Sequence, residues 1–117
     1  MQVQAITKNV RMSAQKMREV VRQIQGLPAA NAHAILAAVP RKGARLVAKT
    51  LKSAIANAED LKEHKKEYNG MRTDRLVIKE AVAQTASTLR RFTPKARGSA
   101  GPILKRSCHI KIVLSDE

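Results

Sequence analysis

The sequence predicts an α+β fold in which helices come first and a long β-hairpin follows them. Apolar residues recur at helical spacing in three segments between residues 13 and 61. They alternate at strand spacing in residues 76–83 and again in residues 108–114. Residues 88–106, which separate these two strands, are rich in turn-forming residues and in positive charge. Because two strands that flank a turn-rich segment form a hairpin, we expect a hairpin whose base belongs to a sheet.

The first two helices are bounded by residues that start and stop helices. Ser13 is a suitable N-cap for the first helix, and Gly26 is a suitable stop. Pro28 suits the first turn of the second helix, and Pro40 interrupts it. The apolar positions of the two helices follow helical spacing: Met17, Val20, Val21 and Ile24, and then Ala32, Ile35, Leu36 and Val39.

Residues 41–61 are predicted to form the longest helix, and one of its sides is apolar. That side consists of Ala44, Val47, Ala48, Leu51, Ile55 and Ala58. The many alanines allow the helix to approach its neighbours closely. The polar stretch that follows, residues 62–70, mixes both signs of charge and predicts a solvated connection.

Three strands are predicted. Residues 2–8 alternate loosely and are expected to form a short edge strand. In residues 76–83, the pattern places Leu76, Ile78 and Val82 together on the better-buried face. Residues 108–114 give the clearest alternation, with Cys108, Ile110, Ile112 and Leu114 on one face.

Residues 88–106 lack the means to pack a core. The segment contains no acidic residue, and its cations are Arg90, Arg91, Lys95, Arg97, Lys105 and Arg106. Folding alone would not bury enough apolar area to offset the entropy of ordering it, so we expect a polyanion to order it. With a tip near residues 95–99, the extended hairpin covers about residues 84–107 and projects on the order of 30 Å, at about 3.3 Å per residue.

Size and charge favour a single domain that binds nucleic acid. The 117 residues suffice for one modest core, so one domain is expected over residues 1–117. Lys and Arg number 23 against 9 Asp and Glu, and the resulting net charge of +14 is spread along the whole chain. Charge of this density raises affinity for phosphate polymers.

Cysteine content and hydropathy indicate a reducing compartment and no membrane. The single cysteine, Cys108, excludes an internal disulfide framework. No apolar run approaches the roughly 18–20 residues that span a bilayer, and the N-terminal stretch lacks a signal-peptide core. We therefore expect a cytoplasmic protein, or a mature protein of an organelle.

No enzyme and no cofactor are predicted. His33, His64 and His109 do not combine with Cys108 at any compact metal-ligand spacing. Cys108 and His109 are neighbours on opposite strand faces, so they do not form a catalytic pair. Cys108 is interpreted as a core residue. His109 is expected on the polar face, where an RNA phosphate or base edge and plain solvent are both possible neighbours.

Composition also restricts how nucleic acid is bound. Phe92 and Tyr68 are the only aromatic residues, which argues against sheets that stack successive bases. Recognition through phosphates, 2′-hydroxyls and shape remains, and Gly98 and Gly101 allow the backbone to approach the nucleic acid.

The helices carry further cations. Lys16 and Arg18 lie off the apolar stripe of the first helix. The third helix has a basic stripe of Arg41, Arg45, Lys49 and Lys52 without compensating acids in the helix interior, which favours contact with anions over a merely solvated face. An alternative is a helix-based DNA-binding module, although the third helix is half apolar and the largest basic element lies outside the helices.

Three motifs in order resemble the large-subunit ribosomal protein twenty-two family, bacterial or organellar type. They are RMSAQKMREVVRQIQG (residues 11–26), LKSAIANAE (residues 51–59) and LRRFTPKARGSAGPILKRSCHIKIVLSDE (residues 89–117). The likeness covers almost the entire chain. It departs from the family at Ala14, where the family has proline, and at residues 84–87, where QTAS replaces an acidic Asp-Glu-Gly-Pro run.

The resemblance implies three helices packed on a small three-stranded antiparallel sheet, with a hairpin that threads into ribosomal RNA. It implies as partners the large-subunit RNA, neighbouring ribosomal proteins and the nascent polypeptide, with the chain a monomer within the ribosome. The tip implied to line the peptide exit tunnel is Lys95, Ala96, Arg97, Gly98 and Ser99. The residues expected to bind RNA are Arg11, Lys16, Arg18, Arg41, Arg45, Lys49, Lys52, Arg90, Arg91, Lys95, Arg97, Lys105, Arg106 and His109.

Overall fold

The computed structural model describes residues 1–116, and its elements confirm the predicted α+β class. Three short 3-10 turns, at residues 66–68, 73–75 and 96–98, join some of them. In chain order the elements are β1 (Gln2–Val10), α1 (Ala14–Ile24), α2 (Ala29–Ala38), α3 (Lys42–His64), β2 (Val77–Thr85), β3 (Leu89–Pro94), β4 (Ala100–Lys105) and β5 (Cys108–Ser115).

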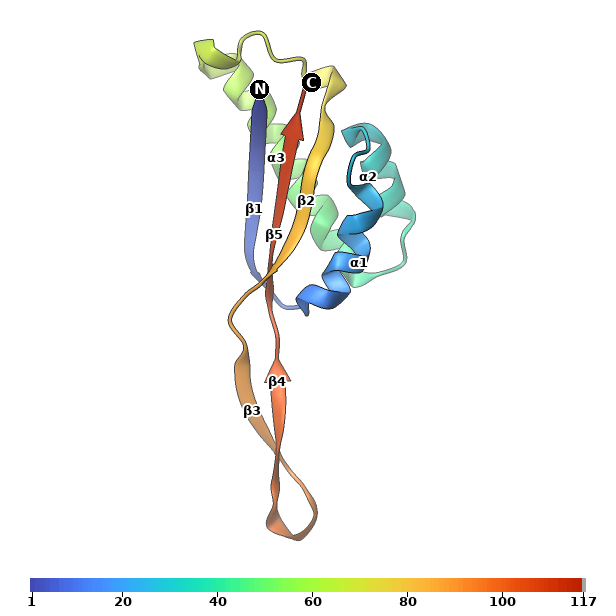
Figure 1. The fold of residues 1–117 in the computed structure, drawn as a ribbon, viewed down its shortest axis with the longest axis vertical. Coiled ribbons are helices and arrows are strands. Elements are labelled where there is room, and N and C mark those ends of the chain that lie inside the picture. The colour runs from blue at the N-terminus through green and yellow to red at the C-terminus, as the bar shows by residue number, and fades with distance from the viewer. Residues whose placement is uncertain (117) are drawn as a thin grey trace.

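The strands form two separate antiparallel ladders. One is a three-stranded sheet in the order β1-β5-β2, and the other is the two-stranded pair β3-β4. Figure 1 shows the three helices against one face of the larger sheet, while β3 and β4 project from its lower end as a twisted hairpin. The chain is accordingly elongated, with principal extents of 67 × 28 × 16 Å. The expected three-stranded sheet with a protruding hairpin is confirmed.

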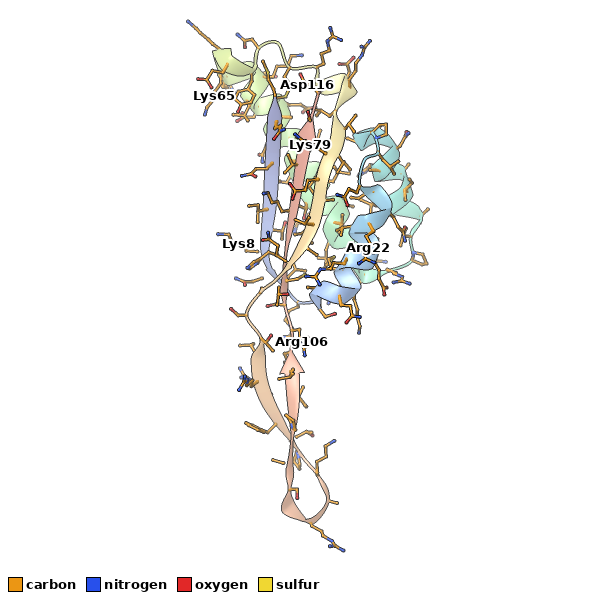
Figure 2. The ribbon with its side chains drawn as sticks, viewed as in Figure 1. Lys8, Arg22, Lys65, Lys79, Arg106 and Asp116 are labelled. Carbon is orange, nitrogen blue, oxygen red and sulfur yellow. The ribbon has the colours of Figure 1, made fainter. Side chains whose placement is uncertain are left out.

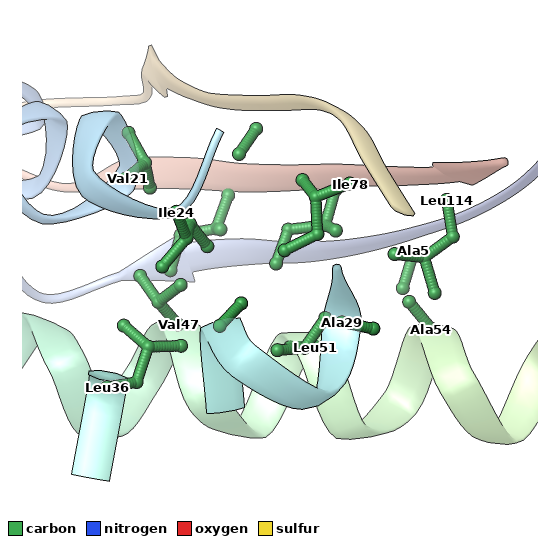
Figure 3. Packing of buried hydrophobic residues seen from close by; sticks show 14 of the residues in the cluster. Ala5, Val21, Ile24, Ala29, Leu36, Val47, Leu51, Ala54, Ile78 and Leu114 are labelled. Carbon is green, nitrogen blue, oxygen red and sulfur yellow. The ribbon is translucent and has the colours of Figure 1, made fainter. Parts of the chain in front are cut away.

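The core lies between the helices and the inner face of this sheet (Figure 3). Its centre brings Val47 and Leu51 of α3 toward Ile78 of β2 and Leu114 of β5, and all four side chains are fully buried or nearly so. Ile24 of α1 closes the layer from the side of β2. The hairpin contributes no large side chain to this core.

The ends of the first two helices follow the sequence signals. The Ser13 hydroxyl accepts a hydrogen bond from the Lys16 backbone N–H at 3.3 Å, so α1 is capped even though Ala14 replaces the family's proline. Gly26 follows α1 with a φ of 82°, a left-handed conformation that glycine adopts at little cost. The helix α2 begins directly after Pro28 and ends two residues before Pro40.

The third helix is longer than predicted. The sequence predicts a helix over residues 41–61, whereas α3 spans Lys42–His64. Its last turn carries Lys62, and a positive side chain at this end interacts favourably with the helix dipole. His64 also lies 3.4 Å from the Asp60 carboxylate one turn earlier. The polar composition of residues 62–64 therefore marks a solvated helix end and not the start of the connection.

The prediction that Val82 lies on the better-buried face of β2 is wrong. A register shift between Ile78 and Glu80 inserts an extra residue relative to β5. Ala81 and Ala83 consequently face the core, and Val82 lies half-buried on the outer face. A β-bulge exchanges the two faces of the residues that follow it, and a strict two-residue period cannot reveal this.

One edge of the three-stranded sheet is covered by backbone hydrogen bonds, whereas the other is an edge strand. The connection between α1 and α2 covers β2: Gly26 N–H donates to the Ile78 carbonyl, Ile78 N–H donates to Leu27, and Ala29 N–H donates to Leu76, each at 2.9 Å. On the other side, β1 is an edge strand, as expected from the sequence. It runs to Val10, beyond the predicted residue 8.

Cys108 is a core residue, as predicted, at the start of the central strand β5. It has no exposed surface. Burial raises the pKa of the Cys108 thiol, and the nearby Arg18 guanidinium only partly opposes this effect. The thiol is therefore neutral and shielded in the folded protein.

Candidate nucleic-acid interface

The hairpin tip is a tight turn centred on Arg97 and Gly98. Both residues have positive φ, 60° and 74°, as the two central residues of a type I′ turn require. Ser99 N–H donates to the Ala96 carbonyl at 3.4 Å, and Lys95 N–H donates to the Ser99 carbonyl at 2.6 Å. The turn reverses the chain with small side chains next to Arg97, which is exposed at the tip.

The Lys95 side chain packs against Gly101 near the tip. A Cβ atom at position 101 would stand 2.4 Å from Cε and 3.0 Å from Cγ of Lys95. The aliphatic stem of Lys95 therefore lies across the backbone of Gly101, which is buried although the hairpin around it is exposed. The absence of a side chain at position 101 thus leaves room for the Lys95 stem, and a Cβ atom there would displace that stem.

The hairpin arms carry the four remaining cations of the 88–106 segment. Arg90, Arg91, Lys105 and Arg106 are all exposed. Residues opposite each other in the β3-β4 ladder share a face, so Arg90 lies beside Leu104, and Arg91 lies beside Ile103 on the reverse face. No acidic residue occurs between Glu80 and Asp116. The hairpin consequently presents positive charge on both faces, with no internal counter-charge.

A cleft of about 640 Å³ lies where the hairpin leaves the body. Three cations line it: Lys16 and Arg18 from α1, and Arg106 from the end of the hairpin. The Arg18 Nε donates to the Ala83 carbonyl of β2 at 3.1 Å, which fixes this guanidinium at the rim. The cations of the first motif and of the hairpin stem, some 90 residues apart in sequence, thus meet in one acid-free cleft.

A neutral joint connects the hairpin to the body. Ala86 N–H donates to the Ser107 carbonyl at 3.1 Å, and the Ser107 hydroxyl donates to the Ser87 carbonyl at 2.5 Å. These bonds hold the two arms together at the position where the family's acidic run is replaced. The bend between β2 and β3 therefore forms here without acidic residues.

The predicted basic stripe on α3 is exposed, but one member is neutralised. Arg41 forms an ion pair with Glu19 of α1. Arg45, Lys49 and Lys52 make no ion pair within residues 1–116 and remain available to anions. Arg11, which also was predicted to bind RNA, is exposed, and its backbone carbonyl accepts a hydrogen bond from Lys42 Nζ at 3.2 Å. The basic stripe of α3 lies on the side of the helix away from the sheet, so it forms a surface separate from the hairpin.

His109 lies on the outer face of the central strand. Its Nδ1 accepts a hydrogen bond from the Asn9 backbone N–H at 3.1 Å, which leaves Nε2 for another partner. Lys111 follows on the same face, half-buried between Ile6 and Val82 of the neighbouring strands. Sequence reasoning had not selected Lys111, although the alternation in residues 108–114 already placed it on this face.

Two classes of site are not found in residues 1–116. No group of three or more His, Cys, Asp or Glu side chains is arranged to hold a metal ion. None of the helices in this range combines the length and the hydrophobicity needed to cross a membrane.

Comparison with known proteins assigns the family. A family model described as ribosomal protein L22p/L17e matches residues 5–115. The chain belongs to this family. A large ribosomal subunit protein uL22 of Opitutus terrae is 50% identical over 116 residues, which cover 99% of this chain and 96% of the relative. The uL22 proteins of Akkermansia muciniphila and Methylacidiphilum infernorum are 46% and 44% identical over 117 residues, which cover the whole chain and 98% and 96% of the relatives.

Membership of the L22p/L17e family confirms the resemblance found in the three motifs. The chain is therefore a ribosomal protein, with the cytoplasmic location that this implies and that the sequence predicted. Its match to the family covers the body and the hairpin alike.

Proposed function

We propose that the chain is a structural component of the large ribosomal subunit that binds ribosomal RNA through its hairpin and lines the nascent-peptide exit tunnel with the tip. One observation carries the proposal: an acid-free, cationic hairpin projects from the folded body without packing against it. The names of the relatives place those proteins in the large subunit.

The hairpin needs a partner for physical reasons. An isolated two-stranded ladder is marginally stable in water, and this one has large exposed apolar side chains at Leu89, Phe92, Ile103 and Leu104. Its cations repel one another. Bound RNA would relieve both the charge repulsion and the apolar exposure, because phosphates neutralise the cations and packed nucleotides cover the apolar groups.

The distribution of charge suits RNA that surrounds the hairpin. Cations on both faces of the arms can contact phosphates on two sides, and Lys16, Arg18 and Arg106 can receive a further backbone segment in the cleft. Ser13, Thr85, Thr88 and Ser107 line the same cleft and supply polar groups for phosphates or 2′-hydroxyls. The expected contact is with the shape and backbone of the RNA and not with base sequence.

The tip has a different composition, which supports a role in the tunnel wall. Ala96, Gly98 and Ser99 are small and exposed, and the type I′ turn keeps the end of the hairpin narrow. A narrow tip occupies little of a passage through which a polypeptide must move. In the family that the motifs resemble, this tip forms part of the tunnel wall.

A charge-matched pair of variants tests the hairpin as the RNA anchor. Changing Arg90, Arg91, Lys95 and Arg97 together to Ala should leave the body folded and lower the affinity for large-subunit RNA. The slope of log K against log salt concentration should become shallower by roughly 0.7–0.9 for each phosphate that the variant no longer neutralises. Filter binding over a salt series measures both quantities.

The matched control removes the same charge from the opposite end of the body. Lys65, Lys66, Arg72 and Arg75 are exposed in the connection between α3 and β2, which lies at the end of the body opposite the hairpin (Figure 1). Changing these four to Ala should alter the salt slope much less. An equal change of slope in both variants would show that net charge alone, and not the hairpin, determines RNA binding.

A further inference from the structure

The two faces of the hairpin are chemically unlike. One face carries Leu89, Arg91, Thr93, Gly101, Ile103 and Lys105. The other, which we call the Phe92 face, carries Arg90, Phe92, Pro94, Ala100, Pro102 and Leu104. Phe92 stands directly opposite Pro102, with Pro94 two residues further along its own strand. The Phe92 face is thus a short apolar strip with one cation at its body end.

The Phe92 ring is exposed to an unusual degree. It is 74% exposed, against 40–47% for the other large apolar side chains of the hairpin, and it is the only phenylalanine in the chain. Phe92 does not belong to the buried core, so core packing does not explain an aromatic residue at this position. A planar ring that the fold leaves open is suited to a planar partner.

The charges around the ring indicate the class of that partner. Arg90 shares the face with Phe92, while Arg91 and Lys105 lie on the reverse face of the same two strands. An apolar peptide would cover the ring but would leave Arg90, on the same face, without a counter-charge. A nucleotide satisfies both features, because its base has a flat π-face and its phosphate is an anion. The face is therefore complementary to RNA and not to an apolar segment of protein.

We propose that Phe92 stacks on an unpaired nucleobase of the ribosomal RNA, with Arg90 contacting a neighbouring phosphate. The proposal rests on the proposed function and adds a defined contact to it. Base stacking on one ring differs from the aromatic platforms that the composition excludes, since a single ring accepts a single base. Pro102 and Leu104 flank the ring and exclude water from the edge of the stacked base.

Substitutions separate stacking from simple apolar contact. Phe92→Leu keeps an apolar side chain but removes the π-face, and it should weaken binding to the complete large-subunit RNA by roughly 5- to 150-fold. Phe92→Tyr keeps the ring and should bind nearly as well as the unchanged protein. Neither change removes a positive charge, so the salt slope should stay the same. Wild-type affinity in Phe92→Leu would overturn the proposal.

Cross-linking in assembled large subunits identifies the partner directly. Phe92 is replaced by a diazirine-bearing phenylalanine, and Leu89, on the reverse face, is replaced in a second preparation. We expect the probe at 92 to label RNA at an unpaired nucleotide, located by reverse transcription. Labelling of a polypeptide, or of a base-paired nucleotide, would overturn the stacking proposal.

The two positions also separate this proposal from the proposed function. If the probe at 89 labels RNA while the probe at 92 labels polypeptide, the hairpin binds RNA but Phe92 does not stack on a base. If neither position labels RNA in assembled subunits, the hairpin is not an RNA anchor, and both proposals fail.

Discussion

Replacing residues 88–106 with an Asn-Gly turn is expected to lower the affinity for large-subunit RNA on the order of 10³-fold while the body remains folded. The deletion removes all six cations of the hairpin arms and tip together. The salt slope should become shallower by about 0.9 for each duplex phosphate that these cations neutralise, so the effect should be largest at low salt. Binding isotherms at several salt concentrations measure it.

The structure shows why the body tolerates this deletion. Ser87 and Ser107 are joined by a 2.5 Å hydrogen bond, so a two-residue turn can connect them without moving β2 or β5. Circular dichroism and a cooperative thermal transition provide the control for folding. A shortened protein that still binds RNA with full affinity would show that α3 or the sheet is the anchor. Tight binding of short duplex DNA by that protein would favour the alternative of a helix-based DNA-binding module.

A pair of leucine substitutions should separate the stability of the body from that of the hairpin. Leu51 of α3 is fully buried beneath the sheet, so Leu51→Ala should lower the free energy of unfolding by about 2–5 kcal/mol. Leu104 of β4 is 47% exposed and is not a core residue, so Leu104→Ala should change the free energy of unfolding by less than about 0.5 kcal/mol. Urea denaturation of the free protein measures both values. Comparable decreases in the two variants would mean that the hairpin folds as part of the body.

Much of the fold was predictable because its signals are local. Ser13, Gly26, Pro28 and Pro40 bound the first two helices, and each acts within a few residues of its own position. The alternation in residues 108–114 identified the central strand, since all of its inner positions are buried. The hairpin followed from a turn-rich segment between two strands, which is also a short-range pattern.

The remaining features depend on contacts between distant segments. The bulge in β2 exists only relative to its partner β5, so residues 76–83 alone gave the wrong face for Val82. Arg41, at the start of α3, pairs with Glu19 of α1. The sequence around Arg41 contains no acidic residue, so this partner could not be predicted from it. Such features require the packed structure and not the local pattern.

Some parts of the candidate RNA-binding surface were likewise predictable from local sequence, and others were not. The cations of the hairpin were found from composition, because a segment so rich in charge and so poor in apolar area is recognisable by itself. The cleft formed by Lys16, Arg18 and Arg106 could not be predicted in this way, because α1 and the hairpin stem meet only in the folded protein. The Phe92 face likewise depends on the β3-β4 register, which decides that Phe92 faces Pro102.

Cleavage from a tethered iron chelate tests whether the hairpin tip lies against ribosomal RNA at the tunnel. Ser99→Cys places a reactive thiol at the tip, whereas Cys108 is fully buried and its raised pKa keeps it unreactive. Lys65→Cys supplies the control at the opposite end of the body (Figure 2). In assembled large subunits, the chelate at position 99 should cleave RNA segments that line the exit tunnel, and the chelate at position 65 should cleave none of them. Absence of tunnel cleavage from position 99, in subunits where position 65 cleaves RNA, would mean that the tip does not line the tunnel.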